Sequence, residues 1–144
     1  MSINFERRED AYLAVAWAVL VANKVGTIQQ RNFMHSYVKG LALFNDYSEE
    51  EYSMMVGAMY MKANQLFLDK EGALMEERVL ELIAAVNEYL TVQDCLEVYS
   101  MAVGIACADK LCEEEKILLA QLQAGLNIDE NYAKEVHAEF ENMS

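Results

Sequence analysis

The 144-residue chain contains no proline at all. Proline lacks the amide N–H that a helix interior needs, so its absence favours long uninterrupted helices. It also argues against proline-rich linkers and kinked connections. A chain of this length can bury a sizeable core without disulfides or structural metals. We therefore expect one helical domain that covers residues 1–144, with short turns between its helices.

Cysteine is scarce, with only Cys95, Cys107 and Cys112. An odd number of cysteines without a secretory signal fits a reducing cytoplasm better than a disulfide framework, so we predict a cytoplasmic location. Cys107 and Cys112 could hold a soft metal, but no second cysteine pair or nearby histidine completes a zinc site. Small thiols in the core are the favoured interpretation for Cys95 and Cys107.

Long hydrophobic runs are absent as well. The longest apolar run, Ala11 to Ala22, holds 12 residues, which is too few to cross a bilayer. The segment before it, Phe5 to Asp10, mixes both charge signs, whereas a signal peptide begins with a cationic region. We interpret the run as a buried helix and expect no direct membrane insertion.

Catalytic motifs are missing from the chain. His35 and His137 are the only histidines, and each lies in a helical pattern without a nearby acid and nucleophile. The sequence contains no His-Glu-x-x-His, no glycine-rich phosphate loop and no nucleophile elbow. We predict that the protein is not an enzyme and uses no organic cofactor.

Basic residues are few, since 11 Lys and Arg face 24 Asp and Glu and the net charge is −13. Such acidity argues against DNA, RNA and anionic membrane surfaces as partners. It favours cations or basic protein surfaces. Solubility alone would also explain a strongly acidic composition.

Apolar residues recur at helical spacing along the whole chain, and no segment alternates with period two. This pattern predicts an all-α fold, a bundle of about seven helices. Ser48 with Glu51, and Thr91 with Asp94, are helix-capping signals, and Asp129 is expected to cap the last helix. The expected helices span about residues 8–24, 29–43, 49–68, 73–90, 91–108, 113–126 and 129–141. The first and fifth are rich in small apolar residues, so we expect them to be the most buried.

A weak internal repeat relates the first and fifth expected helices. Ala22-Asn23-Lys24 resembles Ala108-Asp109-Lys110, and the helix after each bend carries Gly-Leu near its end. Two such helix hairpins packed face to face would bury the first and fifth helices against each other.

Carboxylates gather where the fifth expected helix turns into the sixth. Asp109 ends one helix and Glu113–Glu115 begin the next. Hard cations bind oxygen ligands gathered in this way, so Asp109, Glu113 and Glu115 are candidate ligands for calcium, magnesium or manganese. Alternatively, the glutamates only stabilise the helix start, with Glu115 in a capping box at Cys112.

The same corner resembles that of the tellurite-resistance TerB-like family, whose pattern is roughly Ala-Asp-Gly-x-Leu-Ser-x-x-Glu. Its Asp, apolar, Ser and Glu positions are matched here by Asp109, Leu111, Cys112 and Glu115. The Gly-x pair is shortened to Lys110 alone.

Residues 25–32 fit the same frame as a first copy of the corner. Gly26 and Ile28 match it, but Val25 stands at the Asp position and Asn32 at the Glu position. Since this corner has lost both carboxylates, we expect no divalent cation there.

The resemblance implies a cytoplasmic, all-helical domain of about seven helices that binds a divalent cation through the corner acids. It also implies a role in a stress response to tellurite and other toxic agents. The other function class is a metal-independent interaction or scaffold domain with a protein partner, using the acidic surface or the Met-rich helix around Tyr52–Met61. Burial of that helix among its neighbours is the favoured structural interpretation. The sequence leaves the oligomeric state open.

Overall fold

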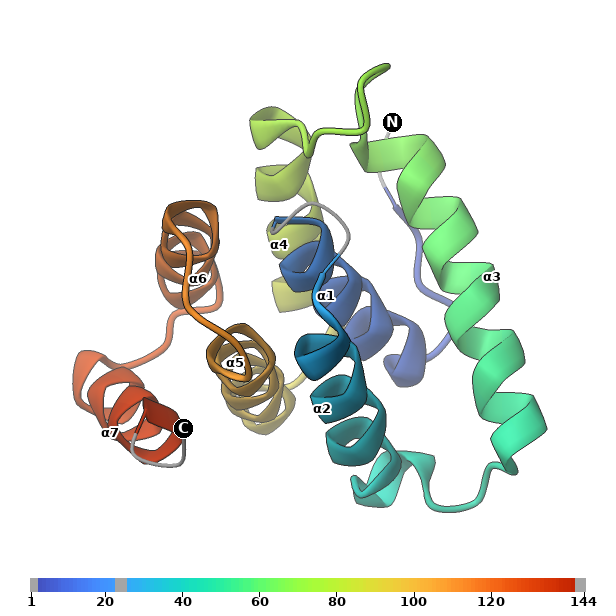
Figure 1. Cartoon of the computed structure of the whole chain (residues 1–144), viewed down its shortest axis with the longest axis horizontal. Coiled ribbons are helices and arrows are strands. Elements are labelled where there is room, and N and C mark those ends of the chain that lie inside the picture. Colours follow the sequence, from blue (N-terminus) through green and yellow to red (C-terminus); the bar gives the residue numbers. More distant parts are fainter. Residues whose placement is uncertain (1–2, 23–25, 142–144) are drawn as a thin grey trace.

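The computed structural model describes residues 3–22 and 26–141, and within these ranges the regular structure is helical (Figure 1). The only strand-like pairing in this part of the chain is an isolated antiparallel bridge between Leu68 and Leu74. The prediction of an all-α fold with about seven helices is therefore confirmed. The helices are α1 (Arg8–Ala22), α2 (Ile28–Lys39), the 3-10 helix η1 (Ala42–Phe44), α3 (Glu49–Phe67), α4 (Glu76–Tyr89), α5 (Val92–Cys107), α6 (Glu113–Gly125) and α7 (Glu130–Glu141).

Helices α1 and α5 form the centre of the core, as their composition predicts. Every residue from Ala11 to Leu20 is buried, and so is nearly all of α5 from Val98 onward. Small side chains let the two helices pack closely against each other. Tyr12 and Trp17 lie inside the core.

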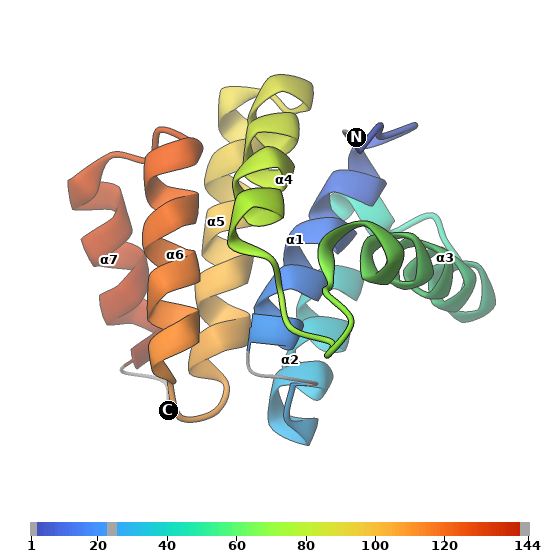
Figure 2. The same cartoon turned by 90° about the horizontal axis from the view of Figure 1, so that it is seen from above.

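The two halves of the internal repeat pack face to face. The hairpin of α1 and α2 lies against the hairpin of α5 and α6, with α1 on both α5 and α6, and α2 on α5. Figure 2 shows α5, α6 and α7 side by side, with α3 turned across the bundle at the opposite edge. The polar starts of α2 and α6 thereby come to lie beside the central helices.

Within the described residues, two helix boundaries differ from the predicted ones by more than one residue. Helix α2 ends at Lys39 instead of continuing to Leu43, because Gly40 closes it and a separate 3-10 turn follows. Helix α4 begins at Glu76 instead of Ala73, because the preceding residues form a tight turn. In that turn Asp69 accepts hydrogen bonds from the backbone N–H groups of residues 71 and 73. The predicted extension of α1 to Lys24 lies outside the described residues.

The prediction that the Met-rich helix is buried is half wrong. Tyr52, Met55 and Met59 are buried, but Met54 and Met61 are 69% and 67% exposed. The reason is the position of α3 at the edge of the molecule, where it packs mainly on α1 and is covered on one side only.

Among residues 3–22 and 26–141, no helix combines the length and the apolar character needed to cross a membrane.

Candidate functional site

The start of α6 is held by a buried carboxylate. Glu115 is inaccessible to solvent, and one of its oxygens accepts a hydrogen bond from the backbone N–H of Cys112 at 2.9 Å. The other oxygen accepts a hydrogen bond from the side-chain amide of Gln30 on α2. Both oxygens of this predicted metal ligand therefore already have protein donors. Glu115 has the capping role that the alternative interpretation gave it.

The start of α2 is built in the same way around Gln30, which is also fully buried. The side-chain carbonyl oxygen of Gln30 accepts a hydrogen bond from the backbone N–H of Thr27 at 3.2 Å. In return, the Thr27 hydroxyl accepts one from the backbone N–H of Gln30 at 3.1 Å. The amide nitrogen of Gln30 then reaches Glu115 and, at 3.5 Å, the carbonyl oxygen of Ala106. The two helix caps thus meet at one buried hydrogen bond.

This geometry corrects the alignment of the first corner. The residue that corresponds to Glu115 is Gln30, the third residue of its helix, and not Asn32, which is exposed. The spacing Thr27-x-x-Gln30 is a capping-box signal that would have located it from sequence. Val25, at the expected Asp position, lies outside the described residues.

The three candidate metal ligands lie in different surroundings. Asp109 is partly exposed, and its carboxylate accepts the backbone N–H of Lys110 at 2.7 Å. Glu113 is exposed and lies 4.0 Å from Lys116, whereas Glu115 points into the interior. Within the described ranges, no three His, Cys, Asp or Glu side chains gather closely enough to hold an ion. Cation binding by these residues stays a prediction.

Next to the α5–α6 corner lies a groove of about 910 Å³ between α6, the start of α4 and the end of α1. We call it the α4–α6 groove. Its lining residues are Val21, Ala22, Glu71, Gly72, Ala73, Leu74, Glu76, Val79, Glu114, Ile117, Leu118 and Gln121.

The floor of the α4–α6 groove is apolar. Val79 and Leu118 are buried beneath it, and Leu74 is half-buried at its side. Ile117 is 52% exposed, whereas the three leucines of the same helix are buried. An exposed branched side chain above a buried apolar floor offers surface that a partner can remove from water.

Three glutamates, Glu71, Glu76 and Glu114, are exposed among the groove-lining residues. Each is placed by local structure. The Asp69 turn presents Glu71, while Glu76 and Glu114 occupy the first turns of α4 and α6. Acids are favoured in first turns because the helix macrodipole is positive there. The fold thus places these acids beside the groove at little cost in stability.

A close contact limits the groove on one side. A Cβ atom on Gly125 would lie 2.3 Å from Cγ2 of Ile83, so α4 and α6 nearly touch at that level. The groove-lining residues of both helices precede this contact in sequence. The absence of a side chain at Gly125 lets the helices meet there, and the groove occupies the space toward their N-terminal ends.

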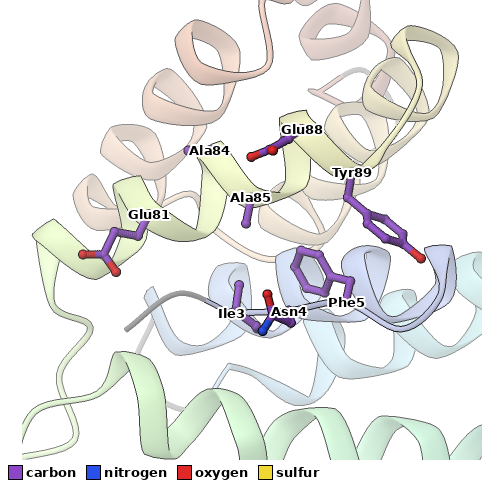
Figure 3. A pocket seen from close by; sticks show the side chains of 8 residues that line it. All are labelled: Ile3, Asn4, Phe5, Glu81, Ala84, Ala85, Glu88 and Tyr89. Carbon is purple, nitrogen blue, oxygen red and sulfur yellow. The ribbon is translucent and has the colours of Figure 1, made fainter.

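A second hollow, of about 1010 Å³, lies between the N-terminal segment and α4 (Figure 3). Its two aromatic side chains already contact each other, because the rings of Phe5 and Tyr89 pack edge to face at 5.8 Å. Ile3 is buried in the core. Since its large apolar side chains have partners within the chain, this hollow is the weaker candidate site.

The charge of the chain is unevenly distributed. Residues 69–144 carry 17 acidic and 5 basic side chains, a net charge of −12, whereas residues 11–68 carry 4 of each. All but two of the α4–α6 groove residues belong to the acidic part. A cationic ligand would therefore be attracted to this side of the molecule over several ångströms.

No family model matches this chain, and no curated protein or solved structure matches it either. The likeness to the TerB-like family accordingly rests on the sequence pattern of the two helix hairpins and their corners alone. It stays a prediction, as do the function and location that it implies.

Proposed function

We propose that this chain is a metal-independent interaction domain that binds a basic amphipathic helix of a partner protein in the α4–α6 groove. The observation that carries the proposal is the combination of an apolar floor with three exposed glutamates at one groove. Helix-in-groove binding is a recurrent mode of peptide recognition, in which the apolar face of the helix packs on such a floor.

The two parts of the groove have different roles. Ile117 and the floor around Leu74 supply affinity, since burial of apolar surface is the main favourable term in protein association. The carboxylates of the groove select for lysine and arginine on the flanks of the partner and speed its approach. Acidic or nucleic-acid ligands are repelled by the same charges.

The ligand must carry several positive charges beside an apolar strip. An amphipathic helix with apolar residues at i, i+3, i+4 and i+7 has this arrangement, because residues of that spacing share one face. A small monocation would satisfy one carboxylate and leave the apolar floor in water. This argument selects a basic helix as the occupant of the groove.

The direct test uses a fluorescein-labelled, end-capped 18-residue peptide of leucine and lysine with helical spacing, titrated at physiological salt. We compare the triple variant Glu71→Gln, Glu76→Gln, Glu114→Gln with a triple variant of equal charge change away from the groove, Glu88→Gln, Glu135→Gln, Glu139→Gln. Fluorescence anisotropy should show at least a tenfold loss of affinity for the first and less than a threefold loss for the second. Equal losses would mean non-specific attraction to an acidic protein and would overturn the proposal.

A second comparison separates the apolar contribution from charge. Ile117 and Leu80 are 52% and 53% exposed, but only Ile117 lines the groove. Ile117→Ser should weaken peptide binding several-fold, because it removes apolar area from the interface. Leu80→Ser should leave the affinity unchanged. Indistinguishable affinities for the two variants would show that the floor is not the binding surface.

A further inference from the structure

The outer face of α3 is an apolar surface that nothing in the described chain covers. Met54 and Met61 are the two largest exposed residues on it, and Gly57 and Ala58 lie between them. Their spacing of three, four and seven residues places all four on one side of the helix, opposite the buried Tyr52 and its neighbours. Figure 1 shows α3 along one edge of the molecule.

No contact among the described residues requires a glycine at position 57. A Cβ atom at this position would meet no other atom within 4 Å, so no close approach inside the monomer requires a glycine. Glycine is the least favourable residue in a helix interior apart from proline. Small residues on an exposed helix face permit close approach of another backbone. The face is therefore suited to close packing against another helix.

The face is complementary to itself. Two α3 helices that run antiparallel about a point between Gly57 and Ala58 place Met54 of one copy opposite Met61 of the other. The methionines then pack over the small residues at the centre, and both halves of the interface are identical. This is the isologous arrangement that a two-fold symmetric dimer requires.

The charges on α3 are compatible with this pairing. No Asp or Glu occurs between Tyr52 and Leu68, in a chain whose net charge is −13. In the antiparallel register Glu50 stands opposite Gln65, and Glu51 lies on the same flank as Lys62 of the other copy. No carboxylate faces a carboxylate in this register, whereas two copies that met through the acidic part, residues 69–144, would repel each other.

We infer that two copies of this chain associate through an antiparallel pair of α3 helices. The inference is independent of the proposed peptide groove, whose lining residues include none from α3. A single helix pair buries less surface than the roughly 1,200–2,000 Å² of a standard stable interface. The dimer is accordingly weak and forms only at high protein concentration.

Sedimentation equilibrium between low micromolar and millimolar concentration tests the association. The wild-type protein should shift from monomer to dimer, and Met54→Glu or Met61→Glu should weaken the dimer at least tenfold. Val92 is 81% exposed on α5, so Val92→Glu adds the same charge to another apolar surface residue and should leave association unchanged. A wild-type protein that stays monomeric throughout, or a dimer that withstands both methionine variants, overturns the inference.

Gly57→Ala separates self-association from folding. Alanine has the higher helix propensity and meets no atom at this position, so the monomer should melt at a higher temperature. The added methyl groups separate the paired backbones, so the dimer should weaken at the same time. A Gly57→Ala dimer as tight as the wild type contradicts close helix packing at this point.

The register is tested by mixing two cysteine variants, Met54→Cys and Met61→Cys, each also carrying Cys112→Ser. Oxidised glutathione as the oxidant should link the two variants to each other faster than it links either variant to itself. In the antiparallel register position 54 faces position 61 of the other copy. Equal rates of mixed and self linkage would exclude this register.

Discussion

A capping box begins the second helix at two corners, the one between α1 and α2 and the one between α5 and α6, but the capping side chains differ. In each corner the third helical residue caps the start of its own helix, and the two residues, Gln30 and Glu115, then hydrogen-bond to each other. The first cap is an amide and the second a carboxylate. A buried carboxylate needs donors, and the amide supplies one without bringing a second charge. The difference between the corners is thus what allows them to meet.

The corners also differ in what surrounds the cap. The α5–α6 corner contributes Glu113 and Glu114 at the surface, and Glu114 lines the α4–α6 groove. The first turn of α2 contains no acidic residue. The start of α2 therefore has only a structural role, whereas the start of α6 combines that role with part of a candidate binding surface.

The largest effect is expected from Gln30→Glu, which gives both corners a carboxylate cap. Two buried carboxylates would then face each other without a cation, and we expect a loss of about 3–5 kcal/mol in the free energy of unfolding. Urea denaturation at pH 7 measures it. Like-charge repulsion raises the pKa of one carboxyl above its unfolded value, so part of the lost stability should return as the pH falls below that raised pKa. An unfolding free energy equal to that of the wild type would show that Gln30 and Glu115 do not share a buried site.

Helix α5 has a glycine, Gly104, at a close contact with two other helices, whereas α1 contains no glycine. A Cβ atom there would lie 2.6 Å from Cζ of Phe33 and 3.0 Å from Phe140, on α2 and α7 respectively. Phe33 cannot move easily, because it packs against the rings of both Tyr37 and Phe140. We expect Gly104→Ala to destabilise the protein by about 1–3 kcal/mol. A raised melting temperature would contradict this packing, since alanine otherwise stabilises a helix.

Exchanging the caps sharpens the comparison. Glu115→Gln alone keeps a hydrogen-bonding side chain and should cost about 1–2 kcal/mol. The double variant Gln30→Glu, Glu115→Gln restores one carboxylate and one amide. It should be several kcal/mol more stable than Gln30→Glu alone, because the repulsion and the desolvation of the second buried carboxylate are removed. A double-mutant cycle on urea midpoints measures this coupling. Additive effects would mean that the two caps are energetically independent.

The opposite ends of α1 and α5 are joined by charge instead. Arg8 donates to Asp94 at 2.8 Å and 3.2 Å. Burial alone would raise the pKa of Asp94, but hydrogen bonds from Arg8 and Thr91 outweigh it and hold the pKa below its usual range. This stabilisation is present above the unfolded pKa and is lost as the pH falls through the lower folded pKa.

Asp94→Asn should therefore cost about 1 kcal/mol at pH 7, a modest amount because Arg8 is half exposed. Urea denaturation from pH 7 to pH 2 should show that the variant approaches the stability of the wild type in acid. A constant difference across this range would mean that ionisation of Asp94 is not the cause.

The fold was largely predictable because its signals are local. Helical periodicity predicts the number of helices and most of their first residues. The capping pairs Ser48 with Glu51 and Thr91 with Asp94 locate two of these starts. The end of α2 and the start of α4 were missed, because they depend on Gly40 and on the Asp69 turn.

The candidate site was much less predictable, because it depends on which side of a helix faces which neighbour. Three consecutive glutamates begin α6, yet Glu115 is buried, Glu114 lines the groove and Glu113 faces solvent near Lys116. The capping-box spacing from Cys112 singles out Glu115 in the sequence, but nothing there separates Glu113 from Glu114. Gln30 has only the capping-box spacing with Thr27 as a sequence signal, and Ile117 belongs to no charged or metal-binding pattern.

The smallest expected effect concerns divalent cations at the two corners. Asp109 already accepts the Lys110 N–H, and both oxygens of Glu115 already accept hydrogen bonds. A cation at the second corner would have to break the buried cap or bind Asp109 and Glu113 alone, and the first turn of α2 offers no carboxylate. We therefore expect calcium, magnesium and manganese at 10 mM to leave the melting temperature of the wild type unchanged.

The sensitivity of this test follows from linkage. An ion with a dissociation constant of about 1 mM would stabilise the folded state by about 1.4 kcal/mol at 10 mM, which raises the melting temperature by about 4–5 °C for a domain of this size. Asp109→Asn keeps the size of the side chain and removes its charge, so it is the matched control. A rise of this size in the wild type that Asp109→Asn abolishes would establish the cation site that the TerB-like resemblance implies. The α4–α6 groove would then lie beside a metal centre, and the domain would no longer be metal-independent.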